Sequence, residues 1–167
     1  MSKNIFKIAL VLIALFYFSS CGFKPMYKLT ENTIDFRSYS ITIMNGNDTS
    51  REIKEEIKRS FPSSSEIKKE YVIEINTDEN LEALITNTDG TVAKYKIEII
   101  INFKVKDNNK DSYLIEDMVR GFAQYTVETS EIESDDIRKR MIRNATSSAI
   151  QMMISKIQSD TSITNDN

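Results

Sequence analysis

The sequence predicts an α+β fold, a two-layer sandwich in which two helices cover one face of a four-stranded mixed sheet, in the order β-α-β-β-β-α. Four segments alternate apolar and polar residues with the period of two that half-buried strands show, and two others repeat apolar residues at helical spacing. A helix separates the first two strands, which favours a parallel crossover. Short turns join the later strands, which favours antiparallel hairpins.

The first strand is expected at residues 38–44, where apolar and polar side chains alternate. An Asn-Gly-Asn-Asp turn follows it. The next helix begins with a capping box formed by Thr49 and Glu52 and ends at Pro62, which cannot continue a helix. Apolar residues recur at every fourth position of this helix, at Ile53, Ile57 and Phe61.

The second strand is expected at residues 67–76. A polar stretch at 77–80 is then either a bulge or a break, and extended structure resumes up to Thr86. Asp89-Gly90 indicates a hairpin, because this dipeptide readily supplies the positive φ angles of tight turns. The third strand has the clearest alternation, with apolar residues at Tyr95, Ile97, Ile99, Ile101, Phe103 and Val105.

The fourth strand is expected at residues 113–125, and its alternation slips near Glu116-Asp117, where a bulge could reset the face. The last helix is expected at residues 134–158, with Ser130 and Ser134 as rival caps. Its expected buried stripe consists of Ile137, Met141, Ala145, Ala149, Met152, Met153 and Ile157.

Residues 1–20 have the features of an export signal peptide. Two lysines without a nearby acid precede an uncharged apolar run at residues 8–18. A run of this length suits the core of a signal peptide and is shorter than the roughly 20 residues that a membrane-spanning helix needs. Two small serines end the leader and suit a signal peptidase.

Cys21 is the only cysteine and directly follows those serines. This is the arrangement of a bacterial lipobox, in which the thiol accepts a diacylglyceryl group and cleavage leaves the cysteine as the first residue. Phe18 stands where leucine is usual, and an ordinary secretory leader with an unpaired thiol remains the alternative. A single cysteine cannot form an internal disulfide, which favours lipidation, and the two or more lipid chains would anchor the protein to a membrane.

The predicted organisation is therefore a signal peptide at residues 1–20, a lipidated tether at 21–33, a single α+β domain at 34–159 and a disordered tail at 160–167. The length suits one hydrophobic core.

The composition excludes several classes of function. The absence of histidine, with a single cysteine, excludes Ser–His and Cys–His catalysis and the usual metal sites, and no Gly-rich phosphate loop is present. We therefore predict no metal, no cofactor and no enzymatic activity. The adjacent acids Glu55-Glu56 and Asp135-Asp136 lie on predicted helices at positions that look solvated. The net charge of −3 argues against nucleic-acid binding.

Three motifs resemble a known family. Residues 21–27 read Cys-Gly-Phe-Lys-Pro-Met-Tyr, residues 88–95 read Thr-Asp-Gly-Thr-Val-Ala-Lys-Tyr, and residues 121–125 read Gly-Phe-Ala-Gln-Tyr. With the Ala/Ile/Met-rich last helix, they resemble the lipopolysaccharide-assembly lipoprotein (LptE) family of Gram-negative bacteria, particularly its alphaproteobacterial branch. Met26 replaces the commoner leucine, and Lys94 stands where an arginine is frequent.

The resemblance implies a lipid-anchored protein of the outer membrane that faces the periplasm. It implies that the protein plugs a large β-barrel protein, LptD, aids its assembly and binds lipopolysaccharide (LPS), which the pair places in the outer leaflet. No covalent chemistry is implied. The alternative is an interaction subunit of another envelope complex, such as the β-barrel insertion machinery. A ligand-binding domain acting alone would instead need a sizeable apolar pocket between the layers.

Three basic residues are candidates for contact with lipid phosphates or with the barrel wall. Lys94 and Lys96 stand at the start of the third strand, beside the Asp-Gly turn, and Arg120 lies on the fourth strand. Phosphates need cationic partners or backbone donors. A strand face that is merely solvated is the alternative.

Overall fold

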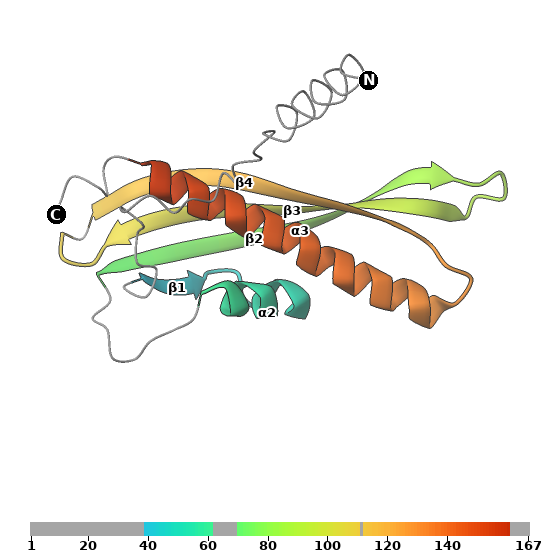
Figure 1. The fold of residues 1–167 in the computed structure, drawn as a ribbon, viewed down its shortest axis with the longest axis horizontal. Helices are drawn as coiled ribbons and strands as arrows, with labels where there is room; N and C mark the ends of the chain where they lie inside the picture. Colours follow the sequence, from blue (N-terminus) through green and yellow to red (C-terminus); the bar gives the residue numbers. More distant parts are fainter. Residues whose placement is uncertain (1–38, 62–69, 111, 161–167) are drawn as a thin grey trace, which may run out of the picture. The chain divides into compact units, whose positions relative to one another are not determined.

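The computed structural model describes residues 39–61, 70–110 and 112–160. The predictions for the signal peptide, for Cys21, for the tether and for residues 161–167 lie outside these ranges. The elements, in chain order, are β1 (Tyr39–Ile43), α2 (Arg51–Ser60), β2 (Tyr71–Thr86), β3 (Val92–Asp107), β4 (Ser112–Thr126) and α3 (Glu131–Ser159) (Figure 1). This is the predicted α+β fold with the predicted order of elements.

The four strands form one sheet in the order β1-β2-β3-β4. β1 and β2 are parallel, as the intervening helix predicted, and the other pairs are antiparallel. The first hairpin turns at Gly90, whose φ of 87° is a conformation that residues with a side chain rarely adopt. The second turns after Asp107, whose carboxylate accepts a hydrogen bond from the backbone N–H of Asn109 at 2.7 Å.

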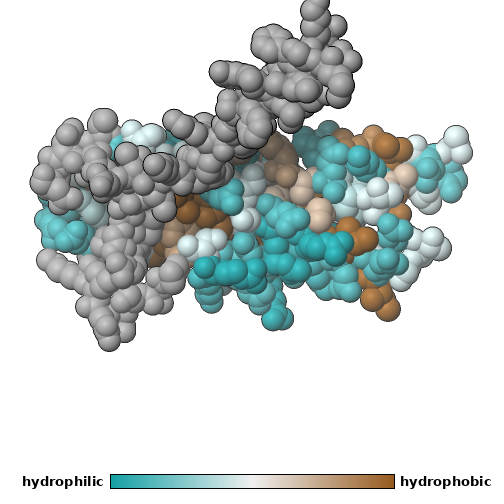
Figure 2. Space-filling view, in the orientation of Figure 1, coloured by the Kyte–Doolittle hydropathy of each residue, from teal (hydrophilic) through white to brown (hydrophobic). Residues whose placement is uncertain are grey.

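The core lies between one face of the sheet and the two helices. The predicted alternation of β3 is confirmed, because every second residue from Ile97 to Val105 is almost completely buried. α2 contributes Ile53 and Ile57, and α3 contributes a longer stripe. Seen from the helix side, the visible part of the surface is mostly hydrophilic, with some apolar patches (Figure 2). The β2–β3 hairpin extends beyond the ends of α3 and β4 (Figure 1).

α3 approaches β4 most closely at Gly121. A Cβ atom built at this residue would lie 1.9 Å from the carbonyl oxygen of Ala145 and 2.9 Å from the backbone nitrogen of Ala149. Both alanines are fully buried. The helix backbone therefore rests directly on the strand, a contact that a glycine in the strand permits.

The polar stretch at residues 77–80 is neither a bulge nor a break. β2 runs through it in continuous register with β3, and the irregularities lie nearer to the hairpin tip. Thr77 is buried, but its hydroxyl lies 2.8 Å from the hydroxyl of Thr49. Glu79 accepts a hydrogen bond from Arg138 of α3 at 3.1 Å. Because these inward polar groups have partners, the strand continues without a break.

The bulge predicted at Glu116-Asp117 is also misplaced. The register there is continuous, and the shift between β3 and β4 lies closer to the turn, where Leu114 is the extra residue. Asp117 lies on the helix-facing side of β4, opposite the buried Phe103. This acidic residue is tolerated there without a bulge because Lys156 of α3 donates a hydrogen bond to its carboxylate.

The capping box predicted for α2 is wrong. The cap residue is Ser50, and its side chain makes no cap hydrogen bond. The Thr49 hydroxyl donates to the backbone oxygen of Asn45 at 3.0 Å and lies next to the hydroxyl of Thr77. These contacts join the loop after β1 to β2. Because they use the Thr49 hydroxyl, that side chain is not available to cap α2.

The earlier of the two rival caps starts α3. The Ser130 hydroxyl accepts a hydrogen bond from the backbone N–H of Glu133. Ser134 lies inside the helix, and its hydroxyl makes hydrogen bonds with the backbone of Glu128. The helix is therefore longer at its start than the range predicted from residue 134.

The predicted stripe of α3 is partly wrong. Met152 is 47% exposed, so it lies on the solvent side of the helix. The buried face includes Thr146, a polar residue that the apolar pattern left out. Its burial is possible because its hydroxyl donates to the carbonyl of Ile142 at 2.8 Å. The fully buried face consists of Ile142, Ala145, Thr146, Ala149, Ile150, Met153 and Ile157, with Ile137 and Met141 partly buried.

Three of the four acids expected to be solvated are exposed, but Glu56 is buried and binds Arg59 at 3.0 Å. Within the described ranges, no group of three His, Cys, Asp or Glu residues could hold a metal ion. None of the helices in this part of the chain has the length and apolar character to cross a membrane.

We expect Gly121→Ala to destabilise the fold by about 3 kcal/mol or more, because the new methyl group would have to push α3 away from β4. Gly46→Ala is the matched control, since its Cβ would lie 3.4 Å from its nearest neighbour, the carbonyl oxygen of Ile43. Urea unfolding of the two variants measures the difference. Similar midpoints for both would contradict the close approach of helix and strand.

Candidate functional site

The face of the sheet turned away from the helices, called the outer face below, is polar and organised in rows. The alternation that buries one side of β3 places its charged and amide side chains on the other side. Strand pairing then aligns these with residues of β2 and β4. Read from β2 through β3 to β4, the rows are Glu74–Lys104–Glu116, Asn76–Asn102–Met118, Asp78–Ile100–Arg120, Asn80–Glu98–Phe122 and Glu82–Lys96–Gln124.

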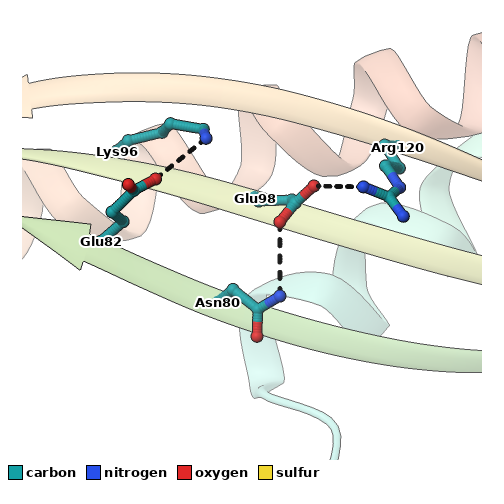
Figure 3. A network of polar contacts seen from close by, with 5 residues as sticks. All are labelled: Asn80, Glu82, Lys96, Glu98 and Arg120. Carbon is teal, nitrogen blue, oxygen red and sulfur yellow. Dashed lines mark hydrogen bonds and ion pairs between the residues drawn. The ribbon is translucent and has the colours of Figure 1, made fainter.

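The structure places the predicted Lys96 on this face with an acidic partner. Its Nζ lies 3.0 Å from the Oε2 of Glu82, directly across on β2 (Figure 3). The same Nζ lies 5.4 Å from the ring centroid of Phe122 on β4. The lysine is therefore held by an ion pair on one side and by a cation–π contact on the other.

Arg120 also has an acidic partner. Its Nη1 lies 3.3 Å from the Oε1 of Glu98, and the second oxygen of that carboxylate accepts a hydrogen bond from the amide of Asn80 at 3.3 Å (Figure 3). Glu98 thus links all three strands. Lys94 lies at the hairpin end of β3, paired with Ile85 of β2 and Thr126 of β4.

Each of these charged pairs has one well-exposed member, which limits its strength. Glu82 is 63% exposed and its partner Lys96 31%, and Arg120 is 50% exposed and its partner Glu98 18%. Exposed ion pairs contribute about 0–1 kcal/mol each. Both cations can therefore exchange their internal carboxylate for a stronger external anion at little energetic cost.

Hydrogen bonds shift the pKa of Lys104, on the outer face, and the pKa of Asp117, on the helix-facing side of β4, in the direction that favours the ionised form of each. A hydrogen bond to the carboxylate of Glu116 raises the pKa of Lys104. The hydrogen bond from Lys156, supported by the backbone N–H of Met118, lowers the pKa of Asp117. On the helix side, burial raises the pKa of Tyr125, which keeps its phenol neutral.

A groove of about 730 Å³ lies at the β1 edge of the sheet, beside α2. Its floor is apolar, and two lysines of α2 lie at its margin. It is not between the layers, where Ile99, Ile150 and Met153 fill the centre of the sandwich. Its lining residues are Tyr39, Ser40, Ile41, Ile43, Gly46, Lys54, Ile57, Lys58 and Phe61.

Sequence reasoning found the basic residues of the outer face but missed the groups that surround them. It did not identify Glu82 and Glu98 as their partners. It also missed the two opposed amides, Asn76 and Asn102. A signal for these partners was present in the sequence. Polar residues alternate along β2 as they do along β3, and the hairpin at the Asp-Gly turn brings the two sets opposite each other.

A protein-family model described as LptE, lipopolysaccharide-assembly, matches residues 36–157 of this chain. The match covers all four strands, α2 and all but the last two residues of α3. No curated protein matches the chain.

Solved structures with a similar fold include several bacterial lipoproteins. Lipoprotein B of Nitrosomonas europaea is 14% identical, with a TM-score of 0.56, and the match covers 81% of this chain and 92% of that one. The rare lipoprotein B of Shewanella oneidensis is 12% identical, with a TM-score of 0.52, covering 77% and 98%. A minor lipoprotein of Acinetobacter baumannii is 9% identical, with a TM-score of 0.52, covering 77% and 95%. At these identities the likeness concerns the fold.

Proposed function

This chain belongs to the LptE lipopolysaccharide-assembly family, and we propose that it acts as the lipid-anchored partner of the outer-membrane β-barrel LptD. In this role it plugs the barrel, aids its assembly and contacts LPS as it passes. The anchor is the lipidated Cys21, and the domain faces the periplasm. The role requires binding surfaces and no covalent chemistry.

The observation that carries this proposal is the family match over residues 36–157, which includes the four strands, α2 and nearly all of α3. The outer face supports it independently. The lumen of an outer-membrane barrel is polar, because the apolar side chains of its strands face the lipid. A plug must therefore present polar surface, and the charged rows of the outer face do so without a large uncompensated charge.

The basic residues Lys94, Lys96 and Arg120 are the proposed contacts for LPS phosphates. Lys96 and Arg120 each form a weak, exposed pair with a carboxylate. A phosphate carries more charge than a carboxylate and offers more acceptor oxygens, so it can replace Glu82 at Lys96. The outer face is then a surface on which internal acids hold the cations in place until an anionic ligand arrives.

The first test is co-purification. We expect the tagged full-length protein, drawn from detergent-solubilised outer membrane of a Gram-negative host, to carry a large β-barrel protein in stoichiometric amount and a diacylglyceryl group on Cys21. Mass spectrometry identifies both. Cys21→Ala should lose the lipid and most of its membrane association, since the buried chains provide the anchor.

Subunits of the barrel-insertion machinery in place of the large barrel would favour the alternative, an interaction subunit of another envelope complex. A protein recovered alone and without lipid would contradict the proposal.

The second test concerns the phosphate contacts. We expect Lys96→Gln to weaken binding of fluorescent LPS to the full chain by about tenfold, the effect of one charge-assisted hydrogen bond. Glu82→Gln should strengthen binding, because it frees the same lysine. Lys104→Gln is the matched control, since Lys104 forms a similar exposed pair with Glu116 on the same face. Equal losses for Lys96→Gln and Lys104→Gln would indicate general charge attraction and contradict a contact at Lys96.

A further inference from the structure

The outer face contains a groove at the end opposite to the β2–β3 hairpin. Its volume is about 490 Å³, and all four strands or the loops after them contribute to it. It lies apart from Lys94, Lys96 and Arg120. Its lining residues are Met44, Glu74, Asn76, Asn102, Phe103, Lys104, Tyr113, Glu116, Asp117 and Met118.

Two amides form the floor of the groove. Asn76 of β2 and Asn102 of β3 are directly opposite each other in the sheet, and both are exposed. Among the described residues, neither carboxamide makes a hydrogen bond with the protein. Each amide offers one acceptor oxygen and two N–H donors. The floor therefore presents donors and acceptors side by side to any molecule in the groove.

An aromatic ring and two methionines form its sides. Tyr113 reaches from β4 across the sheet, and its hydroxyl donates to the Oε2 of Glu74 on β2 at 3.2 Å. The Nζ of Lys104 lies over the Tyr113 ring, 5.4 Å from its centroid. Tyr113 is 53% exposed, so much of its surface remains open. Met44 and Met118 are also exposed and add apolar surface beside the amides.

The charges of the groove disfavour an anion. Lys104 already binds Glu116 at 2.8 Å, and Asp117 is neutralised by Lys156. Glu74 has no cation of its own among these pairs, so the groove has a small excess of negative charge. The charge of Glu74 would repel a phosphate here.

We propose that this groove binds a neutral sugar unit of an oligosaccharide. A sugar ring combines hydroxyl groups, which are both donors and acceptors, with apolar C–H faces. Paired amides and carboxylates match the hydroxyls, and the Tyr113 ring with the two methionines matches the C–H faces. The inference goes beyond the proposed function, because it needs neither the barrel nor a phosphate contact.

The test is an NMR titration of the ¹⁵N-labelled full chain in detergent micelles with two neutral probes, N,N′-diacetylchitobiose and lactose. We expect at least one of them to shift the side-chain NH₂ signals of Asn76 and Asn102 in a saturable way. Inorganic phosphate and spermidine serve as charged probes and should leave these signals in place. A response of the amides to neither sugar, or a stronger response to either charged probe, would overturn the proposal.

Variants then locate the site. Asn76→Ala and Asn102→Ala should each raise the Kd for the active sugar at least tenfold, while the rest of the spectrum keeps its folded dispersion. Asn80→Ala is the matched control, an exposed asparagine on the same face and strand that lies outside the groove. An equal loss in Asn80→Ala would place sugar binding elsewhere and overturn the assignment. Since no barrel is present, failure here leaves the co-purification result unaffected.

Discussion

The close approach of α3 to β4 at Gly121 is the contact on which the rest of the sandwich depends. With no side chain at this residue, the backbone of the helix at Ala145 rests on the strand. This contact sets the height of α3 above the sheet and the residues that it can bury. In a strand, neighbouring side chains point to opposite faces, so fixing the inner face of β4 also fixes its outer face. A shift of one residue would exchange Val119, which is buried, with Arg120, which is exposed.

The outer face that results has two chemically different parts. Near the hairpin, Lys96 and Arg120 form weak pairs with acids and can exchange them for a stronger anion. Near the turn after β3, opposed amides and Tyr113 line a groove with no spare cation. The visible part of the helix-side surface is also mostly hydrophilic, with some apolar patches (Figure 2). The proposed role inside a polar lumen would need polar surface on both sides, and the outer face would meet that need.

Much of the fold could be predicted because the relevant signals are local. Alternation along β3 and the Asp89-Gly90 turn specify a strand and a hairpin without reference to distant residues. Counting outward from a two-residue Asp89-Gly90 turn would pair Glu82 with Ile97. The observed pairing of Glu82 with Lys96 follows from a turn in which Asn87 and Thr91 face each other, and from register shifts near the hairpin tip. The prediction of a bulge or a break at 77–80 left the register beyond that stretch open. β2 continues because distant side chains, Thr49 and Arg138, provide partners for its inward polar groups.

The remaining errors have similar causes. The Thr49 hydroxyl is used by a tertiary contact instead of a helix cap, and Thr146 is buried because it bonds to its own helix. The groove was not predicted because it depends on Tyr113 of β4 reaching across β3 to Glu74 of β2. Contacts of this kind depend on side chains that meet only in the folded sheet, and no local pattern in the sequence reports them.

Site-specific photo-crosslinking in the outer membrane tests most directly whether the outer face meets the barrel. In one variant a photoreactive residue replaces Phe122 on the outer face, and in a second variant it replaces Met152 on α3. The two side chains are similarly exposed, at 52% and 47%. We expect one discrete adduct between the Phe122 variant and a large β-barrel protein. An adduct from Met152 alone, or no barrel adduct from either residue, would contradict it.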